Sequence, residues 1–366
     1  MMYTCAPAGH GSGGAAAARG RTIVRKANKS LRVDIHCHYN NPDVEAMVQH
    51  LKPIEHEPLF KFSNAPTREV NRKQSEDRRP QLSTIEVRLK DMDKMGVDIQ
   101  AVSPAPNQYF YWTEPGLGRD LSRRINDRLA EIVGKWPDRF VALGTVPLQN
   151  ADMAIAELDR CVKTLGLRGI EINTNVNGLN LTDERLGLDR LFARVQELGV
   201  MIFLHPGGFT HADRLTNHYF NNVIGNPLET TIAVSHLIFD GVLDRYPRLK
   251  FVAPHAGGYL AFYHGRIDHA HGARSDCRLV IKKKPSSYLK KFHFDTITHN
   301  RDMLRTLVDT YGPDHVLLGT DYPYDMGVDD PVGFIDGVPK LSRTDKAQIM
   351  GGNAARLLKI KSKAKR

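Results

Sequence analysis

Apolar, β-prone runs that end in a polar residue recur along this chain of 366 residues. The strands we expect lie at residues 32–36, 99–103, 140–145, 169–173, 201–205, 250–255, 292–296 and 316–320. Between most of them, apolar residues recur with the 3.6-residue spacing of amphipathic helices, at 121–136, 151–165, 186–198, 226–246 and 341–360. Alternating strands and helices predict a parallel sheet, because each crossover is right-handed. Eight such units predict an α/β fold closed into a (β/α)8 TIM barrel.

One long stretch does not fit this repeat. Residues 40–84 follow the first predicted strand directly and are charged and proline-containing. A long loop at the catalytic face of a barrel commonly acts as a lid or specificity element, whereas the alternative is a disordered surface loop. Leu59, Phe60 and Phe62 favour an inserted, lid-like segment. We therefore expect a single barrel domain over residues 31–360, a disordered extension over 1–30 and a basic tail over 361–366.

Metal-ligand residues stand at the ends of the predicted strands. His36 and His38 end the first one, and two residues apart on a strand they point to the same face. His205 ends the fifth strand and Asp321 follows the eighth. The carboxyl ends of barrel strands meet at the active site, so these four side chains should converge there. Three imidazoles and one carboxylate suit Zn²⁺ or another divalent metal such as Mn²⁺.

Two further residues leave alternatives open. His255 ends the sixth strand and could be a fourth histidine ligand. We favour an unligated His255 that acts as general acid and base, because the other four residues already fill a mononuclear site. Asp295, at the end of the seventh strand, competes with Asp321 as ligand, or it could support a ligand from behind.

Composition excludes several classes of protein. The net charge of +10 comes partly from basic residues near both termini, and no nucleic-acid-binding motif accompanies it, so we expect no specific nucleic-acid partner. No apolar run approaches the roughly 20 residues of a membrane span. The four cysteines show no CxxC spacing and read as reduced thiols, which indicates a cytoplasmic protein.

The same residues resemble a known family. The motifs that carry the resemblance are Asp34-Ile35-His36-Cys37-His38, Phe203-Leu204-His205-Pro206, Pro227-Leu228-Glu229-Thr230-Thr231-Ile232-Ala233, His255-Ala256-Gly257-Gly258, Gly265-Arg266-Ile267-Asp268-His269 and Leu318-Gly319-Thr320-Asp321-Tyr322-Pro323. Together they resemble the metal-dependent amidohydrolase superfamily, in its decarboxylase-rich branch, the 2-amino-3-carboxymuconate 6-semialdehyde decarboxylase-like family. The likeness runs from about residue 85 to 358, plus the first strand.

The resemblance implies a role for each of these residues. The zinc ligands would be His36, His38, His205 and Asp321. His255 would be the catalytic histidine, and Arg266 would reach a substrate carboxylate across a homodimer interface. A second carboxylate-binding arginine belongs in the insertion after the first strand. The sequence of that insertion differs here from the family pattern, so four arginines are candidates for this role: Arg68, Arg72, Arg78 and Arg79.

The sequence thus predicts a zinc-dependent, non-oxidative decarboxylase of a small carboxylated aromatic or muconate-type acid. A metal-dependent hydrolase or hydratase with the same site is the first alternative, since metal-bound hydroxide can attack a C=O or C=C bond. A catalytically silent scaffold or a basic nucleic-acid-binding protein is the second, and metal content would separate it from the enzymes.

Overall fold

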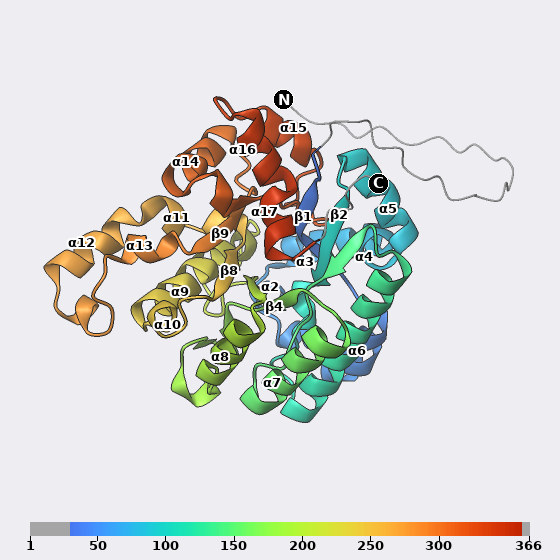
Figure 1. Cartoon of the computed structure of the whole chain (residues 1–366). Helices are drawn as coiled ribbons and strands as arrows, with labels where there is room; N and C mark the ends of the chain where they lie inside the picture. Colours follow the sequence, from blue (N-terminus) through green and yellow to red (C-terminus); the bar gives the residue numbers. More distant parts are fainter. Residues whose placement is uncertain (1–29, 361–366) are drawn as a thin grey trace, which may run out of the picture.

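The computed structural model describes residues 30–360, so almost all of the predicted N-terminal extension and the whole basic tail lie outside the described residues. Eight parallel strands form the centre of the molecule (Figure 1). In chain order they are β1 (Val33–Tyr39), β2 (Ile99–Pro104), β3 (Phe140–Ala142), β4 (Gly169–Ile172), β7 (Met201–Leu204), β8 (Lys250–Ala253), β9 (Phe292–Asp295) and β10 (Val316–Leu317). Each coincides with one of the eight predicted strands.

The strands pair as two parallel sheets, β1-β2-β3 and β10-β9-β8-β7-β4. Single bridges join the sheets at both seams. On one side Gly144, just after β3, pairs with Ile170 of β4. On the other side Cys37 of β1 pairs with Tyr322, after β10, and the amide of His38 donates to the Tyr322 carbonyl at 2.8 Å. The strands therefore follow one another around a ring in chain order, and the predicted α/β barrel class is confirmed.

Helices surround this ring of strands (Figure 1). The longer ones are α5 (Ile85–Met95), α6 (Pro115–Lys135), α7 (Ala151–Asp159), α8 (Asp189–Leu198), α9 (Asn226–Phe239), α12 (Gly265–Ala273) and α14 (Arg301–Tyr311). Shorter helices are α10 (Val242–Arg245), α11 (Leu260–Tyr263), α13 (Pro285–Leu289), α15 (Pro331–Asp336), α16 (Arg343–Ala347) and α17 (Asn353–Leu357). In α14 the buried residues are Leu304, Leu307, Val308 and Tyr311. This spacing of three and four residues places all four side chains on one face of the helix, so the spacing of apolar residues in the sequence shows which face packs on the strands.

Several boundaries differ from the sequence prediction. The first strand runs on to Tyr39, so both histidines lie inside it. The helix predicted over 226–246 is broken at Gly241, whose φ of 75° is left-handed and favours glycine. The closing helix predicted over 341–360 is instead two short α-helices, α16 and α17, joined by a π-helical turn. A short hairpin of β5 (Asn175–Val176) and β6 (Leu179–Asn180) was not predicted at all.

The insertion after β1 consists mostly of short helices. They are α1 (Pro42–Val48), α2 (Pro58–Lys61), α3 (Ala65–Asp77) and α4 (Arg79–Ser83), with two 3₁₀ turns between α1 and α2. The alternative of a disordered loop is therefore wrong for the described chain. Proline stands at the first turn of α2, α3 and α4, where its missing N–H costs nothing. Within residues 30–360, no helix is both long and apolar enough to cross a membrane.

Candidate metal centre and active site

Strand β1 brings two imidazoles to the centre of the barrel. His36 and His38 are both fully buried, and their Nε2 atoms lie 3.1 Å apart. The strand is irregular between Asp34 and Cys37, where its pairing with β2 shifts register. Alternation along the strand nevertheless leaves the two rings on the same side, as the sequence predicts.

His205 and Asp321 complete a group of four possible ligands. His205 directly follows β7, and Asp321 lies four residues beyond β10. One ligand atom from each of His36, His38, His205 and Asp321 lies within 4.8 Å of every other, and all four residues are buried. Neither ring nitrogen of His205 has a hydrogen-bond partner, and Asp321 Oδ1 has none either. Buried polar atoms without partners are rare, so this donor set fits a divalent metal.

The groups behind the two β1 histidines orient their rings. Nδ1 of His36 lies 2.7 Å from Asp295 Oδ2, and Nδ1 of His38 lies 3.0 Å from the carbonyl of Pro104. A proton on each Nδ1 satisfies these acceptors and leaves each Nε2 lone pair directed into the site. Asp295 therefore stands behind His36 and outside the group of four residues that could hold a metal, as expected for a residue that supports a ligand.

The electrostatics of the cluster favour the metal-binding forms of most of these groups. Burial lowers the pKa of His36 and, together with the neighbouring histidines, places the pKa of His205 well below its ordinary value. Burial opposes protonation of His38, but the nearby carboxylates of Asp321 and Glu171 outweigh burial and raise its pKa. Burial opposes ionisation of Asp321, yet the surrounding histidines hold its pKa well below its usual range. A neutral imidazole and an ionised carboxylate are the forms that bind a metal.

His255 lies next to this group without belonging to it. Its Nε2 is 3.9 Å from Asp321 Oδ2, and its ring centroid is 5.2 Å from that of His36. Its Nδ1 has no hydrogen-bond partner. The backbone of His255 is left-handed, with φ 51°, and its amide donates to Asp295 Oδ2 at 2.9 Å. The same carboxylate thus supports the ring of His36 and the backbone of His255.

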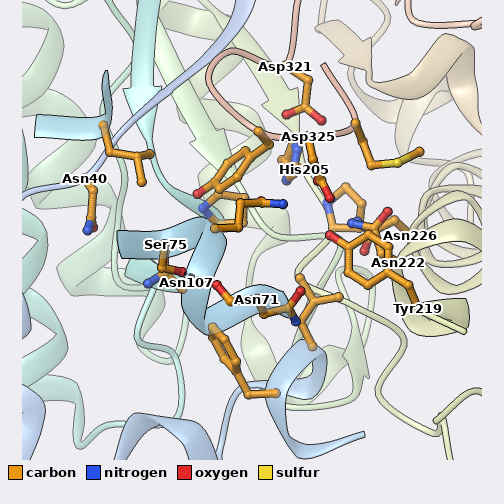
Figure 2. Close-up of a pocket in the computed structure, with 18 of the residues that line it drawn as sticks. Asn40, Asn71, Ser75, Asn107, His205, Tyr219, Asn222, Asn226, Asp321 and Asp325 are labelled. Atoms are coloured by element: carbon orange, nitrogen blue, oxygen red, sulfur yellow. Dashed lines mark hydrogen bonds between the residues drawn. The ribbon is translucent and has the colours of Figure 1, made fainter. Parts of the chain in front are cut away.

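The four-residue group opens into a cavity of about 220 Å³. Its lining includes His205, His255 and Asp321 on the barrel side. Figure 2 shows His205 and Asp321 close together, and it shows polar side chains around the rest of the cavity. These polar residues are Asn40, Asn71, Ser75, Asn107, Tyr219, Asn222, Asn226 and Asp325. Leu59 and Phe60 of the insertion also line the cavity, so the insertion forms one of its walls.

The candidate arginines differ in whether they line the cavity. Arg79, at the start of α4, lines the cavity. Arg72 is paired with Glu69 and Glu76, Arg78 donates to the carbonyl of Pro323, and Arg68 is exposed and outside the cavity lining. Arg266 lies exposed on α12 and is not part of this cavity in its own chain.

Sequence reasoning missed several residues that surround the site. Glu171 is fully buried at the end of β4, where its Oε1 accepts from the Tyr109 hydroxyl at 2.7 Å and lies 3.9 Å from His38 Nδ1. Asp34 is fully buried near the start of β1. A charged residue inside an otherwise apolar strand was the available signal for both. Tyr219 lies in a turn after the fifth strand and Asn222 in the π-helical turn that leads into α9, and no periodicity in the sequence could single them out.

The chain is similar to a known protein family over nearly all of its described length. The family model described as amidohydrolase matches residues 33–360. This chain belongs to the amidohydrolase family. Among its curated relatives is the 2-amino-3-carboxymuconate-6-semialdehyde decarboxylase of Dictyostelium discoideum, which is 38% identical over 274 residues, or 75% of this chain and 76% of that protein. The resemblance read from the sequence motifs is confirmed.

Solved structures agree on the fold of this amidohydrolase. The 5-carboxyvanillate decarboxylase LigW from Sphingomonas paucimobilis has a TM-score of 0.81 at 28% identity and covers 91% of this chain and 100% of its own. The dihydroxybenzoic acid decarboxylase from Polaromonas sp. JS666, solved with bound manganese and the inhibitor 2-nitroresorcinol, has a TM-score of 0.77 at 24% identity. It covers 91% of this chain and 98% of its own.

Proposed function

We propose that this amidohydrolase is a metal-dependent, non-oxidative decarboxylase of a small carboxylated aromatic or muconate-type acid, with His36, His38, His205 and Asp321 as metal ligands. The observation that carries the proposal is the buried group of four ligands, with the unpartnered atoms of His205 and Asp321, at the inner end of a cavity that also holds His255. The Dictyostelium discoideum decarboxylase, which is 38% identical to this chain, supports decarboxylation as the reaction. Zn²⁺ and Mn²⁺ both suit the ligand set.

For decarboxylation, the protein must stabilise the electron pair left on the substrate carbon and deliver a proton to that carbon. When the bond between the carboxyl carbon and the substrate breaks, CO₂ leaves and the electron pair stays on the substrate carbon, which must then receive a proton. A bound divalent metal supplies Lewis acidity toward a substrate oxygen. His255 holds the proton and delivers it to the carbon that loses CO₂. It lines the cavity, its Nδ1 has no competing partner, and histidine is the side chain that most often transfers protons in catalysis.

Arg79 is the side chain in the insertion that would hold a substrate carboxylate. Of the four candidates, Arg79 lines the cavity, and its side chain has no other partner among the described residues. Arg72 and Arg78 are paired elsewhere, and Arg68 does not line the cavity. A guanidinium binds a carboxylate through two parallel hydrogen bonds. With Leu59 and Phe60 beside it, the insertion would act as a partial lid over the bound acid.

Arg266 would serve the active site of a second subunit. It has no partner among the contacts of the described chain, and it does not line the cavity of its own subunit. Asp268, its nearest possible partner in sequence, instead lies 3.3 Å from Lys284 Nζ and accepts from the Ser286 amide at 2.9 Å. Exposed Tyr259 and Tyr263 on neighbouring turns would pack in the same interface. The active form would therefore be a homodimer.

The cellular setting is part of the proposal. Cys37 and Cys161 are buried and unpaired, and Cys277 is free as well. Reduced thiols of this kind suit the cytoplasm. Fusion of the full chain to a fluorescent protein would test the location directly, and accumulation in an oxidising compartment would contradict it.

The reaction is tested by incubating metal-loaded enzyme with a panel of carboxylated aromatic and muconate-type acids and measuring CO₂. We expect stoichiometric CO₂ release from at least one acid, which disappears after chelation and returns when Zn²⁺ or Mn²⁺ is added. Conversion of an acid without CO₂, by addition of water to C=C or by cleavage of an ester or amide, would assign the site to a hydratase or hydrolase instead.

The role of Arg266 is tested by mixing two inactive variants, His255→Ala and Arg266→Ala. A mixed dimer then holds one intact site, made of His255 from one chain and Arg266 from the other. Random exchange of subunits should restore about a quarter of the wild-type activity, because half of the dimers are mixed and each has one good site. A mixture that stays inactive although mass spectrometry shows mixed dimers would exclude action across the interface.

A further inference from the structure

A closed ring of five buried polar and aromatic residues lies beside the metal centre, at the seam between β1 and β10. Arg88 Nη1 donates to Gln100 Oε1 at 3.1 Å, and Gln100 Nε2 donates to Asp34 Oδ2 at 3.0 Å. Thr320 Oγ1 donates to the same Asp34 oxygen at 2.7 Å and accepts from the Tyr322 amide at 3.1 Å. The Arg88 guanidinium lies 4.8 Å from the centroid of the Tyr322 ring, which completes the ring. We call these five residues the seam network.

The seam network touches three of the four proposed ligands through the backbone. Asp34 Oδ1 accepts from the amide of His36 at 3.1 Å. Arg88 Nη2 donates to the carbonyl of His38. Thr320, whose own amide donates to Asp34 Oδ1 at 3.1 Å, directly precedes Asp321. The network therefore contacts both β1 ligands and the segment that carries the carboxylate ligand.

Regular strand pairing does not fix the carboxylate ligand. β10 contains only Val316 and Leu317, and its ladder pairs with β9, not with β1. Asp321 follows four residues later with a left-handed φ of 56°. Between residues 318–322 and β1 there is a single bridge, supported by a few backbone hydrogen bonds, one of which runs from the Asp321 amide to the His36 carbonyl at 2.8 Å. The side-chain contacts of the seam network add to these few backbone bonds between the segment of Asp321 and the strand of His36 and His38.

The buried charges of the seam network make this connection rigid. Asp34 and Arg88 are both fully buried, as is Gln100 between them, and Thr320 is 1% exposed. A charge in such a place is stable only while its hydrogen-bond partners keep their geometry. Asp34 has four donors, three of which come from the two ligand-bearing segments, so movement of one segment against the other breaks several of these bonds at once.

We infer that the seam network sets the distance between Asp321 and the two β1 histidines, and thereby the affinity of the site for its divalent metal. Asp34, Arg88, Gln100 and Thr320 are positioning residues, since they act through the ligands and reach neither metal nor substrate. This inference rests on the proposed metal site.

The test measures metal affinity of the full chain by competition with a chelating dye, using Zn²⁺ and Mn²⁺ separately. Thr320→Val keeps the size of the side chain and removes both of its hydrogen bonds in the network, whereas Thr320→Ser keeps the hydroxyl. Asp34→Asn keeps the shape but turns an NH₂ group toward donors. We expect Thr320→Val and Asp34→Asn to weaken metal binding about 10- to 100-fold, as loss of the groups that support metal ligands generally does. Thr320→Ser should bind near the wild-type affinity.

Asn353→Leu is the matched control, because Asn353 is also fully buried and holds the same strand from its other end. Its Nδ2 donates to the carbonyls of Pro313 and Val316, both at 2.8 Å. It should lower the melting temperature without changing the metal dissociation constant. If Thr320→Val, which conserves side-chain volume, binds metal as tightly as wild type, or if Asn353→Leu weakens binding equally, the inference is wrong. If wild type itself binds no metal, the proposed function fails instead.

Discussion

The barrel mouth and the insertion both line one cavity, but they are built in different ways. At the barrel mouth the four proposed ligands are at most 5% exposed, and strand ends or buried hydrogen bonds hold each of them. In the insertion, α3 has 13 residues and none of them is buried. Val44 and Val48 of α1 anchor the start of the insertion in the hydrophobic core, whereas its middle part is held by polar contacts, such as the hydrogen bond of 2.9 Å from Asn221 Nδ2 to the carbonyl of Pro58.

This difference separates reaction from recognition. Residues that bind a metal and move a proton must keep distances within tenths of an ångström, and a buried setting provides that rigidity. Residues that recognise the remainder of the acid are placed on weakly buried helices, whose sequence can change without unfolding the barrel. We therefore expect changes at the mouth to abolish activity with every acid, and changes in the insertion to alter which acid is preferred.

The largest effect should come from removing a ligand at the mouth. His36→Ala and Asp321→Ala should lose the metal and reduce activity to the level of a chelated preparation, while the circular dichroism spectrum stays unchanged. Elemental analysis of purified protein measures the first effect. His50→Ala is the control, because His50 is exposed in the insertion. Full metal content in both variants would refute the ligand assignment.

His255 should give the next largest effect and should separate chemistry from metal binding. His255→Asn is the suitable change, since asparagine tolerates the left-handed backbone found there. We expect metal content to persist and kcat to fall about 10²- to 10⁴-fold, the usual range for a lost general acid or base. If metal is lost as in His36→Ala, His255 is a ligand, which is the alternative that the sequence left open.

Much of the barrel was predictable because its pattern is repeated. Most of the strands lie in mainly apolar stretches of the sequence, and parallel strands that are buried on both faces produce such stretches. The break at Gly241 was not predictable, because the apolar spacing continues across it into Val242 and Leu243. The β5–β6 hairpin was missed because four residues are too few to show alternation.

The candidate site was predictable where chemistry coincides with strand ends, and not elsewhere. The set of His36, His38, His205 and Asp321 is the group that the structure brings together. The choice of Arg79 among four arginines depends on which helical faces meet the cavity, and α3, with no buried residue, and α4, with five residues, show no periodicity that predicts this. Arg88 sits on an amphipathic helix like any surface arginine, and only tertiary packing shows that it is fully buried.

A smaller effect should follow from changing the insertion wall. Arg79→Ala should raise KM about 10- to 100-fold, the value of a charged hydrogen bond, and should leave the metal content at the wild-type level. The control is Arg72→Ala, whose side chain is exposed and pairs with Glu69 and Glu76 away from the cavity. Steady-state kinetics on the preferred acid provide the measurement. A fall in kcat with unchanged KM would mean that Arg79 does not hold the ground-state acid.

The contact of the insertion with the loop after β2 includes a buried carboxyl group. Glu57 is 8% exposed, and its Oε1 accepts from Trp112 Nε1 at 2.6 Å. The His56 ring stacks on the same indole, with centroids 4.4 Å apart. Burial raises the pKa of Glu57 from 4.5 to about 8, because the indole N–H compensates only part of the lost hydration.

This raised pKa should affect stability and leave activity unchanged. Between pH 4.5 and about 8 the folded chain holds the Glu57 proton while the unfolded chain releases it, so stability falls as pH rises. Glu57→Gln keeps the acceptor for Trp112 and removes the titration. Relative to wild type, its free energy of unfolding in urea should be nearly equal at about pH 5 and higher by a few kcal/mol at about pH 9. Glu55→Gln, at an exposed neighbour, should show no such pH dependence. An equal difference between Glu57→Gln and wild type at both pH values would mean that Glu57 is already ionised in the folded protein, and that solvent reaches beneath the insertion at its point of attachment to the barrel.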